Sequence, residues 1–423
     1  MIKNISRILE SNSDISNAPP AAKQDCTDVV HISLFFDGTG NNKDADEEKK
    51  KWSNPARLWR NMNALSIEIE TNWVENIYPI YISGVGTKFN GDLNIFQRVL
   101  ASTEDNILGL GTGAGGTRRL DYGEDQFNDA LAKALILQAK KAKVDLGKYT
   151  NEKKSYSLGQ IDEKVGEHRL IKKINFSIFG FSRGAALARA FTNQLIWKCE
   201  DDNGNLAYGK KEKYPIEFKF LGLFDTVASF GLPATNLNNN LSYKGRDLVI
   251  DDRVKMCVHY VAANELRFCF PVDLIEQDGK LAKSNWKEIV YPGMHSDVGG
   301  GYTPGSQEVN DNYARIPLKD MLDEAINAGV KMYSYDELKN KYNVLFKEQF
   351  EIQEDSKRYY EAVKSAVQPS KNIRTSINNY MKLYYSAYGT MDREGIESVS
   401  QRVRQKIKSV ILFLGDLKIW QQR

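Results

Sequence analysis

The segment FGFSRGAALARAF, residues 179–191, places Ser182 between Gly180 and Gly184 in the pattern G-x-S-x-G. In hydrolases this pattern forms a sharp turn between a strand and a helix, and the glycines are needed because a Cβ there would clash. The turn lifts the serine oxygen clear of the sheet and points the amide of Arg183 towards a developing oxyanion. An apolar run precedes the motif and small residues follow it. We therefore expect Ser182 to be a nucleophile; the alternative is that it only caps the helix.

A serine nucleophile needs a base, and the chain contains four histidines. His295 lies in the glycine-rich segment GMHSDVGGGY, a loop after the last expected strand, where the backbone can approach a ligand closely. His31 is expected inside the first strand, His168 in a charged loop and His259 on an apolar helix, where a structural role is typical. Nucleophile, acid and histidine follow in this order in α/β-hydrolases. We expect His295 to be the base, and a structural role is the alternative.

Several carboxylates could orient this imidazole and fix its tautomer. Asp225 ends the strand that follows the serine, in GLFDTV, and we expect it to fill this role. Asp297 lies just after His295, and we expect it to support its own loop. The remaining candidates are Asp251, Asp252 and Glu265.

A second glycine-rich turn, DGTGNN, follows the first expected strand. It lacks the lysine of a P-loop and the spacing of a dinucleotide fingerprint. Either the amide of Gly38 or Thr39 supplies a second oxyanion donor, with Asp37 organising the turn, or the segment is a plain turn. The sequence contains no convincing cluster of metal ligands, and we expect neither a metal nor a cofactor.

The elements that must position these residues alternate along roughly the first 310 positions. This alternation predicts an α/β fold with a mostly parallel sheet, helices on both faces and an appended helical region at the C-terminus. Helices are expected after residue 123, after Ser182 and over 251–268, and loops over 109–123 and 200–215. Apolar runs predict strands over 29–36, 76–83, 172–179, 216–224 and 287–293.

Composition narrows the class of protein further. The 423 residues carry a formal charge of only +3, which gives no argument for nucleic-acid binding. No segment has the apolar stretch of a signal peptide or of a membrane-spanning helix, so we expect synthesis in the cytoplasm. The scattered cysteines predict free thiols: Cys26, Cys199, Cys257 and Cys269.

We divide the chain into a flexible arm over 1–27, a catalytic domain over 28–311 and a helical region over 312–423. Near the C-terminus an apolar stripe with basic neighbours could lie in a membrane interface. Packing against the core or a partner subunit is the interpretation that we favour, because such stripes are typical of globular helices. The stripe consists of Ile396, Val399, Val403, Ile407, Val410 and Leu414.

Four motifs, HISLFFDGTGNN, FGFSRGAALARAF, GLFDTV and GMHSDVGGGY, occur in this order between about residues 28 and 310. Together they closely resemble the type VI secretion phospholipase effectors of the Tle1 family. The resemblance implies an α/β-hydrolase core and a serine esterase of phospholipase A type that cleaves acyl esters of membrane glycerophospholipids. By position, Ser182 matches the family nucleophile, His295 its histidine and Asp225 the aspartate of the triad.

The resemblance also implies an antibacterial toxin that is secreted into the periplasm of a target cell. Its expected partners are the phospholipid substrate, a secretion spike or adaptor protein and a cognate immunity protein.

One position departs from the family pattern. Where a segment like HALALDE is expected, this chain has HYVAANE, with Asn264 in place of the acidic residue. If that position held the third member of the triad, the chain would be impaired or would recruit Glu265. Two alternatives therefore stay open: an esterase or thioesterase on another acyl substrate, and a catalytically inactive hydrolase fold that serves as a binding module.

Overall fold

The computed structural model describes separate stretches of the chain. Two predictions lie outside them: the arm over 1–27 and the stripe over 396–414. The described residues are 28–72, 76–87, 114–149, 156–165, 168, 170–209, 212–228, 248–267, 270–305 and 311–393.

A mostly parallel sheet forms the centre of the molecule, as predicted. Its parallel strands follow the order β2, β1, β3, β6, β7, β8. A short antiparallel hairpin, β4 and β5, pairs with the beginning of β6. Because the parallel strands all point the same way, their carboxyl ends meet at one edge. The strands are β1 (Asp28–Phe36), β2 (Asn76–Ile82), β3 (Ile171–Phe181), β4 (Glu200–Asp202), β5 (Asn205–Tyr208), β6 (Tyr214–Phe224), β7 (Cys257–Ala262) and β8 (Lys287–Tyr291).

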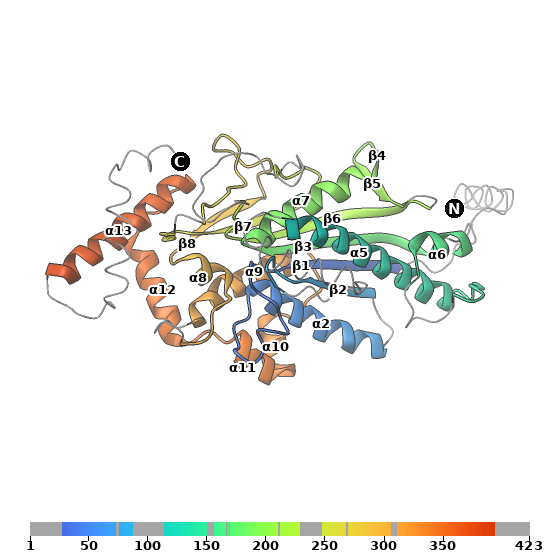
Figure 1. Cartoon of the computed structure of the whole chain (residues 1–423), viewed down its shortest axis with the longest axis horizontal. Coiled ribbons are helices and arrows are strands. Elements are labelled where there is room, and N and C mark those ends of the chain that lie inside the picture. The colour runs from blue at the N-terminus through green and yellow to red at the C-terminus, as the bar shows by residue number, and fades with distance from the viewer. Residues whose placement is uncertain are drawn as a thin grey trace, which may run out of the picture.

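Helices cover both faces of this sheet (Figure 1). The described helices are α2 (Asn54–Asn72), α5 (Ala114–Lys141), α6 (Leu158–Val165), α7 (Arg183–Trp197), α8 (His295–Gly299), the 3-10 turn η4 (Asp311–Ala314), α9 (Arg315–Asn327), α10 (Tyr335–Lys341), α11 (Asn343–Gln349), α12 (Glu354–Ala366) and α13 (Ile373–Arg393).

Alternation along the strands divides the core into two layers. Leu34 of β1 packs in a cluster with Phe127 of α5 and Phe191 of α7. Its neighbour Phe35 points the other way, into a cluster with Met62 of α2 and others. Successive side chains of a strand point to opposite faces, so β1 packs against helices on both faces of the sheet.

The described part of the tail, residues 311–393, is helical, as predicted, and its first helices belong to the second of these clusters. Leu318 and Leu322 of α9 are fully buried and share that cluster with Phe35 and Phe179. Helices α12 and α13 extend beyond one end of the sheet (Figure 1). None of the described helices has both the length and the apolar character that a membrane crossing requires. The domain boundary after residue 311 stays a prediction.

The helix predicted over 251–268 is wrong, because the chain forms strand β7 there. All residues of CVHYVA are buried, since β7 lies between β6 and β8 under helices. A short run that is apolar on every side suits either a buried strand or a buried helix, and periodicity alone does not separate them.

Two predicted loops also contain regular structure. Within the loop predicted over 200–215, residues 200–208 form the hairpin β4–β5, whose turn has Asn203 and Gly204 at φ 53° and 85°. Asn-Gly with positive φ at both positions is the preferred two-residue hairpin turn, so the signal was present in the sequence. The expected loop over 109–123 is helical from Ala114 onwards.

Candidate active site

Ser182 lies at the turn between β3 and α7, the position expected for a nucleophile. Its backbone has φ 59° and ψ −128°, a conformation that L-residues rarely adopt. It precedes α7 at the N-cap position, but its side chain makes no capping hydrogen bond to that helix. The alternative of a purely capping serine therefore has no support in the geometry.

The two glycines of the motif permit the close contacts of this turn. A Cβ on Gly180 would lie 2.6 Å from the Cα of Ala185, and a Cβ on Gly184 would lie 2.3 Å from the carbonyl oxygen of Asp37. Both distances are far below van der Waals contact. Gly184 thus brings the turn after β1 directly against the turn that carries Ser182.

Asp225 follows β6, which lies next to β3 in the sheet. The Ser182 amide donates to the Phe224 carbonyl at 3.0 Å, which fixes the two strand ends relative to each other. One oxygen of the Asp225 carboxyl group, Oδ1, accepts the amide of Ala262 at 2.9 Å. The other, Oδ2, lies 2.6 Å from Nδ1 of His295. Because a carboxylate can only accept, this bond places a proton on Nδ1 and leaves Nε2 as an acceptor.

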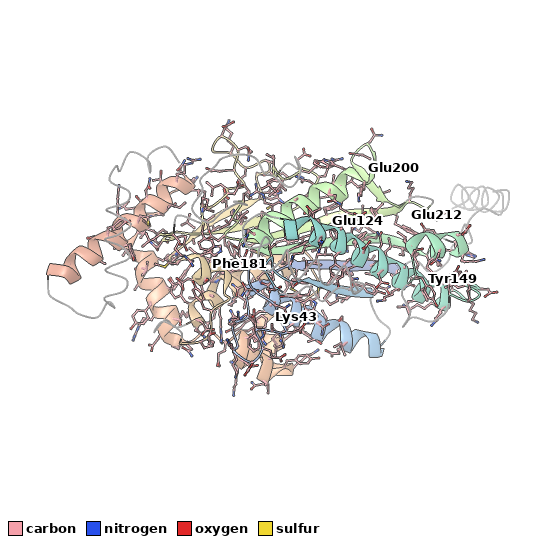
Figure 2. All side chains as sticks on the ribbon, viewed as in Figure 1. Lys43, Glu124, Tyr149, Phe181, Glu200 and Glu212 are labelled. Atoms are coloured by element: carbon pink, nitrogen blue, oxygen red, sulfur yellow. The ribbon has the colours of Figure 1, made fainter. Side chains whose placement is uncertain are left out.

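His295 begins the short helix α8 after β8, rather than lying in a loop as predicted. Its ring packs against that of Phe181, the residue before the serine, with a centroid distance of 4.6 Å. Phe181 lies in the interior of the molecule (Figure 2). The side chains expected to form the triad are thus brought to the carboxyl edge of the sheet, where Ser182 is 2 %, Asp225 1 % and His295 4 % exposed.

The turn after β1 is held by the buried carboxyl group of Asp37. It accepts hydrogen bonds from the hydroxyls of Ser53 and Tyr81 and from the Gly38 amide. Burial raises the pKa of Asp37 to about 6, against the lowering effect of these hydrogen bonds. Asp37 therefore organises the turn, as one of the two sequence interpretations suggested.

The hydrogen bonds of this turn bear on the expected oxyanion donors. The Gly38 amide already donates to Asp37 Oδ1 at 2.7 Å. The Arg183 guanidinium Nε donates to the Thr39 hydroxyl at 2.5 Å and joins the turn to the start of α7. Because the Gly38 amide is already engaged, it is the weakest of the three expected oxyanion donors, and the amides of Thr39 and Arg183 remain the candidates.

The other candidate acids point elsewhere. Asp297 accepts the Met294 amide at 2.7 Å and so closes the first turn of α8. Asp251 accepts from the Arg253 guanidinium at 2.6 and 2.8 Å, and these hydrogen bonds lower the pKa of Asp251. Asp252 is exposed.

Asn264, which stands where the sequence comparison led us to expect an acidic residue, forms hydrogen bonds with the backbone of Gly293. Asn264 Oδ1 accepts the Gly293 amide at 3.0 Å, and the Asn264 amide donates to the Gly293 carbonyl at 2.9 Å. These bonds tie the end of β7 to the segment that leads into His295. An acid at this position is not required for the Asp225–His295 pair.

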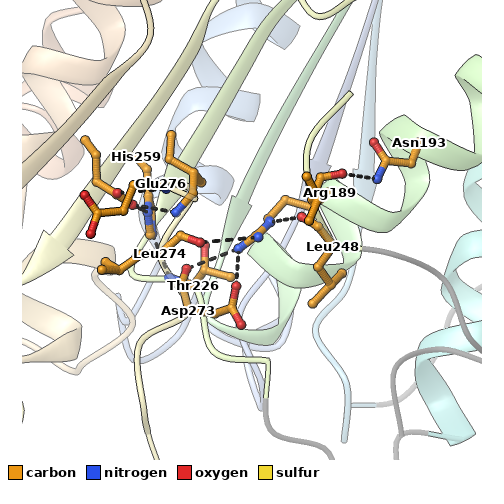
Figure 3. A network of polar contacts seen from close by, with 11 residues as sticks. Arg189, Asn193, Thr226, Leu248, His259, Asp273, Leu274 and Glu276 are labelled. Carbon is orange, nitrogen blue, oxygen red and sulfur yellow. Dashed lines mark hydrogen bonds and ion pairs between the residues drawn. The ribbon is translucent and has the colours of Figure 1, made fainter. Parts of the chain in front are cut away.

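His259 and Glu288 form a second buried histidine–carboxylate pair, which the sequence did not predict. It contacts Thr226, the residue that follows Asp225. His259 on β7 accepts the Thr226 amide at Nε2, 3.1 Å away, while Nδ1 lies 2.6 Å from Glu288 Oε1. Arg189 of α7 extends the network, because its guanidinium binds Asp273, whose amide donates to the Thr226 carbonyl (Figure 3). The network fixes the residue that follows Asp225, so the structural role predicted for His259 agrees with its contacts.

No metal-binding group of three or more His, Cys, Asp or Glu side chains occurs among the described residues. Cys199 and Cys257 are free thiols, and the other two cysteines lie outside the described stretches.

Part of the chain is similar to a known protein family. Residues 197–324 match the family model of the Tle1-like catalytic domain of type VI secretion phospholipase effectors. This matched stretch contains Asp225 and His295. No curated protein sequence matches the chain.

Several solved structures are similar to this chain, among them the following two. An uncharacterized protein from Pseudomonas aeruginosa aligns with a TM-score of 0.66 and 25% identity over 95% of this chain, which spans 58% of the length of that protein. A Tle1 effector bound to the VgrG spike of the type VI secretion system aligns at a TM-score of 0.44 with 19% identity, over 81% of this chain and 80% of that one. The resemblance expected from the sequence is confirmed over residues 197–324, which are similar to the Tle1-like catalytic domain of type VI secretion phospholipase effectors.

Proposed function

We propose that this chain is a serine esterase that hydrolyses acyl ester bonds of membrane glycerophospholipids. The observation that carries the proposal is the 2.6 Å pair of Asp225 and His295 at the sheet edge where Ser182 occupies its positive-φ turn. The family match to phospholipase effectors supports the choice of substrate.

In the proposed mechanism, His295 Nε2 takes the proton of Ser182 Oγ while that oxygen attacks the ester carbonyl carbon. The amides of Arg183 and Thr39 hold the oxyanion, and each such donor is worth about 3–4 kcal/mol. The imidazolium returns its proton to the leaving alkoxide, and lysophospholipid departs from the acyl-enzyme. Water, deprotonated by His295, then cleaves the acyl-enzyme. Fatty acid leaves, and Ser182 regains its proton.

Vesicles of mixed phosphatidylethanolamine and phosphatidylglycerol provide the test. The purified chain should release fatty acid and lysophospholipid, both measured by mass spectrometry, and Ser182→Ala should release neither. Cleavage of short soluble esters or thioesters without cleavage of phospholipid would assign another acyl substrate. No turnover of either class would overturn the esterase proposal and favour a binding module.

We further propose that the chain acts as an antibacterial effector delivered into the periplasm of a target cell. The family description, a type VI secretion phospholipase effector, supports this role and a spike or adaptor protein as carrier. Export of the chain to the periplasm of a test bacterium should stop growth, whereas Ser182→Ala should be tolerated. Equal growth of both strains, with both proteins present in the periplasm, would contradict the proposal. Rescue by co-expression of a neighbouring gene product would identify an immunity protein.

A further inference from the structure

Two aromatic rings flank the imidazole of His295. Phe181 lies on it with a centroid distance of 4.6 Å and an angle of 35° between the ring planes. Phe270 stacks on it at 4.9 Å and 27°. Asp225 binds the ring at a single atom, Nδ1, so that bond alone leaves the ring plane free to tilt. The two flanking rings remove that freedom.

The backbone of His295 is held as well. Its amide donates to Oε2 of Glu265 at 3.1 Å. Glu265 is itself fixed by the Arg267 guanidinium, whose Nε and Nη2 donate to the two carboxylate oxygens at 2.9 and 2.8 Å. Burial opposes ionisation of Glu265, but the hydrogen bond and charge of Arg267 lower its pKa, so the carboxylate stays ionised at neutral pH.

Arg267 joins these two contacts into one unit. Its guanidinium carbon lies 4.3 Å from the centroid of Phe270, the ring that stacks on the imidazole. Its Nη1 also donates to the Tyr302 hydroxyl at 3.1 Å. The Arg267 side chain is 40% exposed, whereas that of His295 is only 5% exposed. The unit therefore runs from the surface to the buried ring.

We propose that Glu265, Arg267 and Phe270 form a histidine clamp, a set of positioning residues that fixes the plane of His295 and covers it from water. The inference rests on the proposed role of His295 as the base. Glu265 fixes the backbone of His295, where α8 begins. Phe270 fixes the plane of the imidazole ring. Arg267 contacts Glu265 and Phe270 and holds both side chains in place. Nε2 is thereby kept in one direction, and small errors in the placement of a catalytic group cost up to about 100-fold in rate.

Kinetics with Phe270 variants test the clamp. Phe270→Leu keeps an apolar side chain but removes the flat ring, so kcat should fall about 10- to 100-fold while KM stays within about twofold. Phe270→Tyr restores a ring and should restore kcat. Tyr359→Leu is the matched control, because Tyr359 pairs with Arg358 at 5.3 Å on the exposed surface of α12. An unchanged kcat in Phe270→Leu, or a loss shared by Phe270→Tyr, would overturn the clamp.

Arg267→Gln gives a second variant outside the hydrophobic core, because the replaced side chain reaches the surface and is 40% exposed. It should lower kcat in the same direction as Phe270→Leu, and the double variant should lose less than the product of the two separate losses. Fully multiplicative effects would show that the two residues act independently and would contradict the clamp.

Chemical labelling of histidines measures how accessible the His295 imidazole is, and it needs no catalytic activity. Diethyl pyrocarbonate acylates accessible imidazole nitrogens, and peptide mapping separates His295 from His259. In Phe270→Leu, His295 should label several-fold faster than in the wild type, while the fully buried His259 stays protected. Unchanged labelling of His295, or equal gains at both histidines, would overturn the clamp. Because labelling does not depend on esterase activity, this result is distinct from a failure of the proposed function.

Discussion

At the scale of single residues, three side chains that follow three different strands, β3, β6 and β8, lie at one edge of the sheet. Their types and their order along the chain were predictable, because Ser182, Asp225 and His295 each come shortly after an expected strand. The partners of His295 were not. Glu265 lies in the segment 251–268 that was predicted as a helix, and Phe270 lies just beyond it, so the contacts of both residues with His295 could not be foreseen.

Asp225→Asn should identify the acid of the proposed triad. The amide keeps the shape of the side chain but no longer favours a proton on Nδ1, so kcat should fall by about 10⁴-fold. Asp251→Asn and Asp252→Asn are the controls, because Asp251 binds Arg253 and Asp252 is exposed. Phospholipid hydrolysis under saturating substrate is the measurement. A comparable loss in either control, or full activity in Asp225→Asn, would refute the assignment.

The raised pKa of Asp37 predicts how stability depends on pH. In the folded protein the pKa of Asp37 is about 6, against an ordinary value of 3.8, so the folded state binds the proton more tightly. Its contribution to the free energy of unfolding is therefore fully present below about pH 4 and is lost as the pH rises through about 6. The loss amounts to about 3 kcal/mol.

Asp37→Asn should remove this contribution, because the amide does not titrate. Urea unfolding at several pH values between 4 and 7 measures the free energy of unfolding of both proteins. The difference between wild type and variant should change by up to about 3 kcal/mol across this window. A constant difference would show that Asp37 does not titrate there.

At the scale of elements, the turn between β3 and α7 is built against the turn after β1. Buried parallel strands such as β1 and β3 were predictable from continuous apolar runs. Strand β7 was not, because its run is too short and too uniformly apolar for periodicity to separate strand from helix. The hairpin β4–β5 could have been found, since Asn203-Gly204 is a strong turn signal, but its polar strands resemble a loop.

Gly184→Ala tests this contact between turns. The new Cβ would lie 2.3 Å from the Asp37 carbonyl oxygen, so one turn must move away from the other. We expect a loss of about 1–3 kcal/mol in the free energy of unfolding and a marked loss of esterase activity. Gly159→Ala in α6 is the control, because its Cβ would meet no atom within 4 Å. Equal stability and activity of the two variants would contradict the expected clash.

At the scale of the whole molecule, the first helices after residue 311 share a core with the sheet. A boundary drawn from sequence separates segments whose patterns differ, but the pattern does not reveal that Leu322 of α9 and Phe35 of β1 pack in one cluster. We therefore expect the sheet and α9 to unfold together.

Leu322→Ala should lower the free energy of unfolding by about 2–5 kcal/mol, because Leu322 is fully buried. Circular dichroism and tryptophan fluorescence should report one coincident unfolding transition in wild type and variant. A separate early transition of the helical signal would show that the C-terminal helices form an independent unit.

The order of the strands has a stereochemical consequence. In the sheet, β3 lies between β1 and β6, so the turn that carries Asp37 and Thr39 flanks Ser182 on one side and Asp225 with His295 on the other. In the proposed reaction, an ester bound across β3 must direct its carbonyl oxygen towards the turn that carries Thr39. Its alcohol oxygen must then face His295. Only one prochiral face of the carbonyl is then open to Ser182. Mirror-image lipids would therefore be cleaved at different rates.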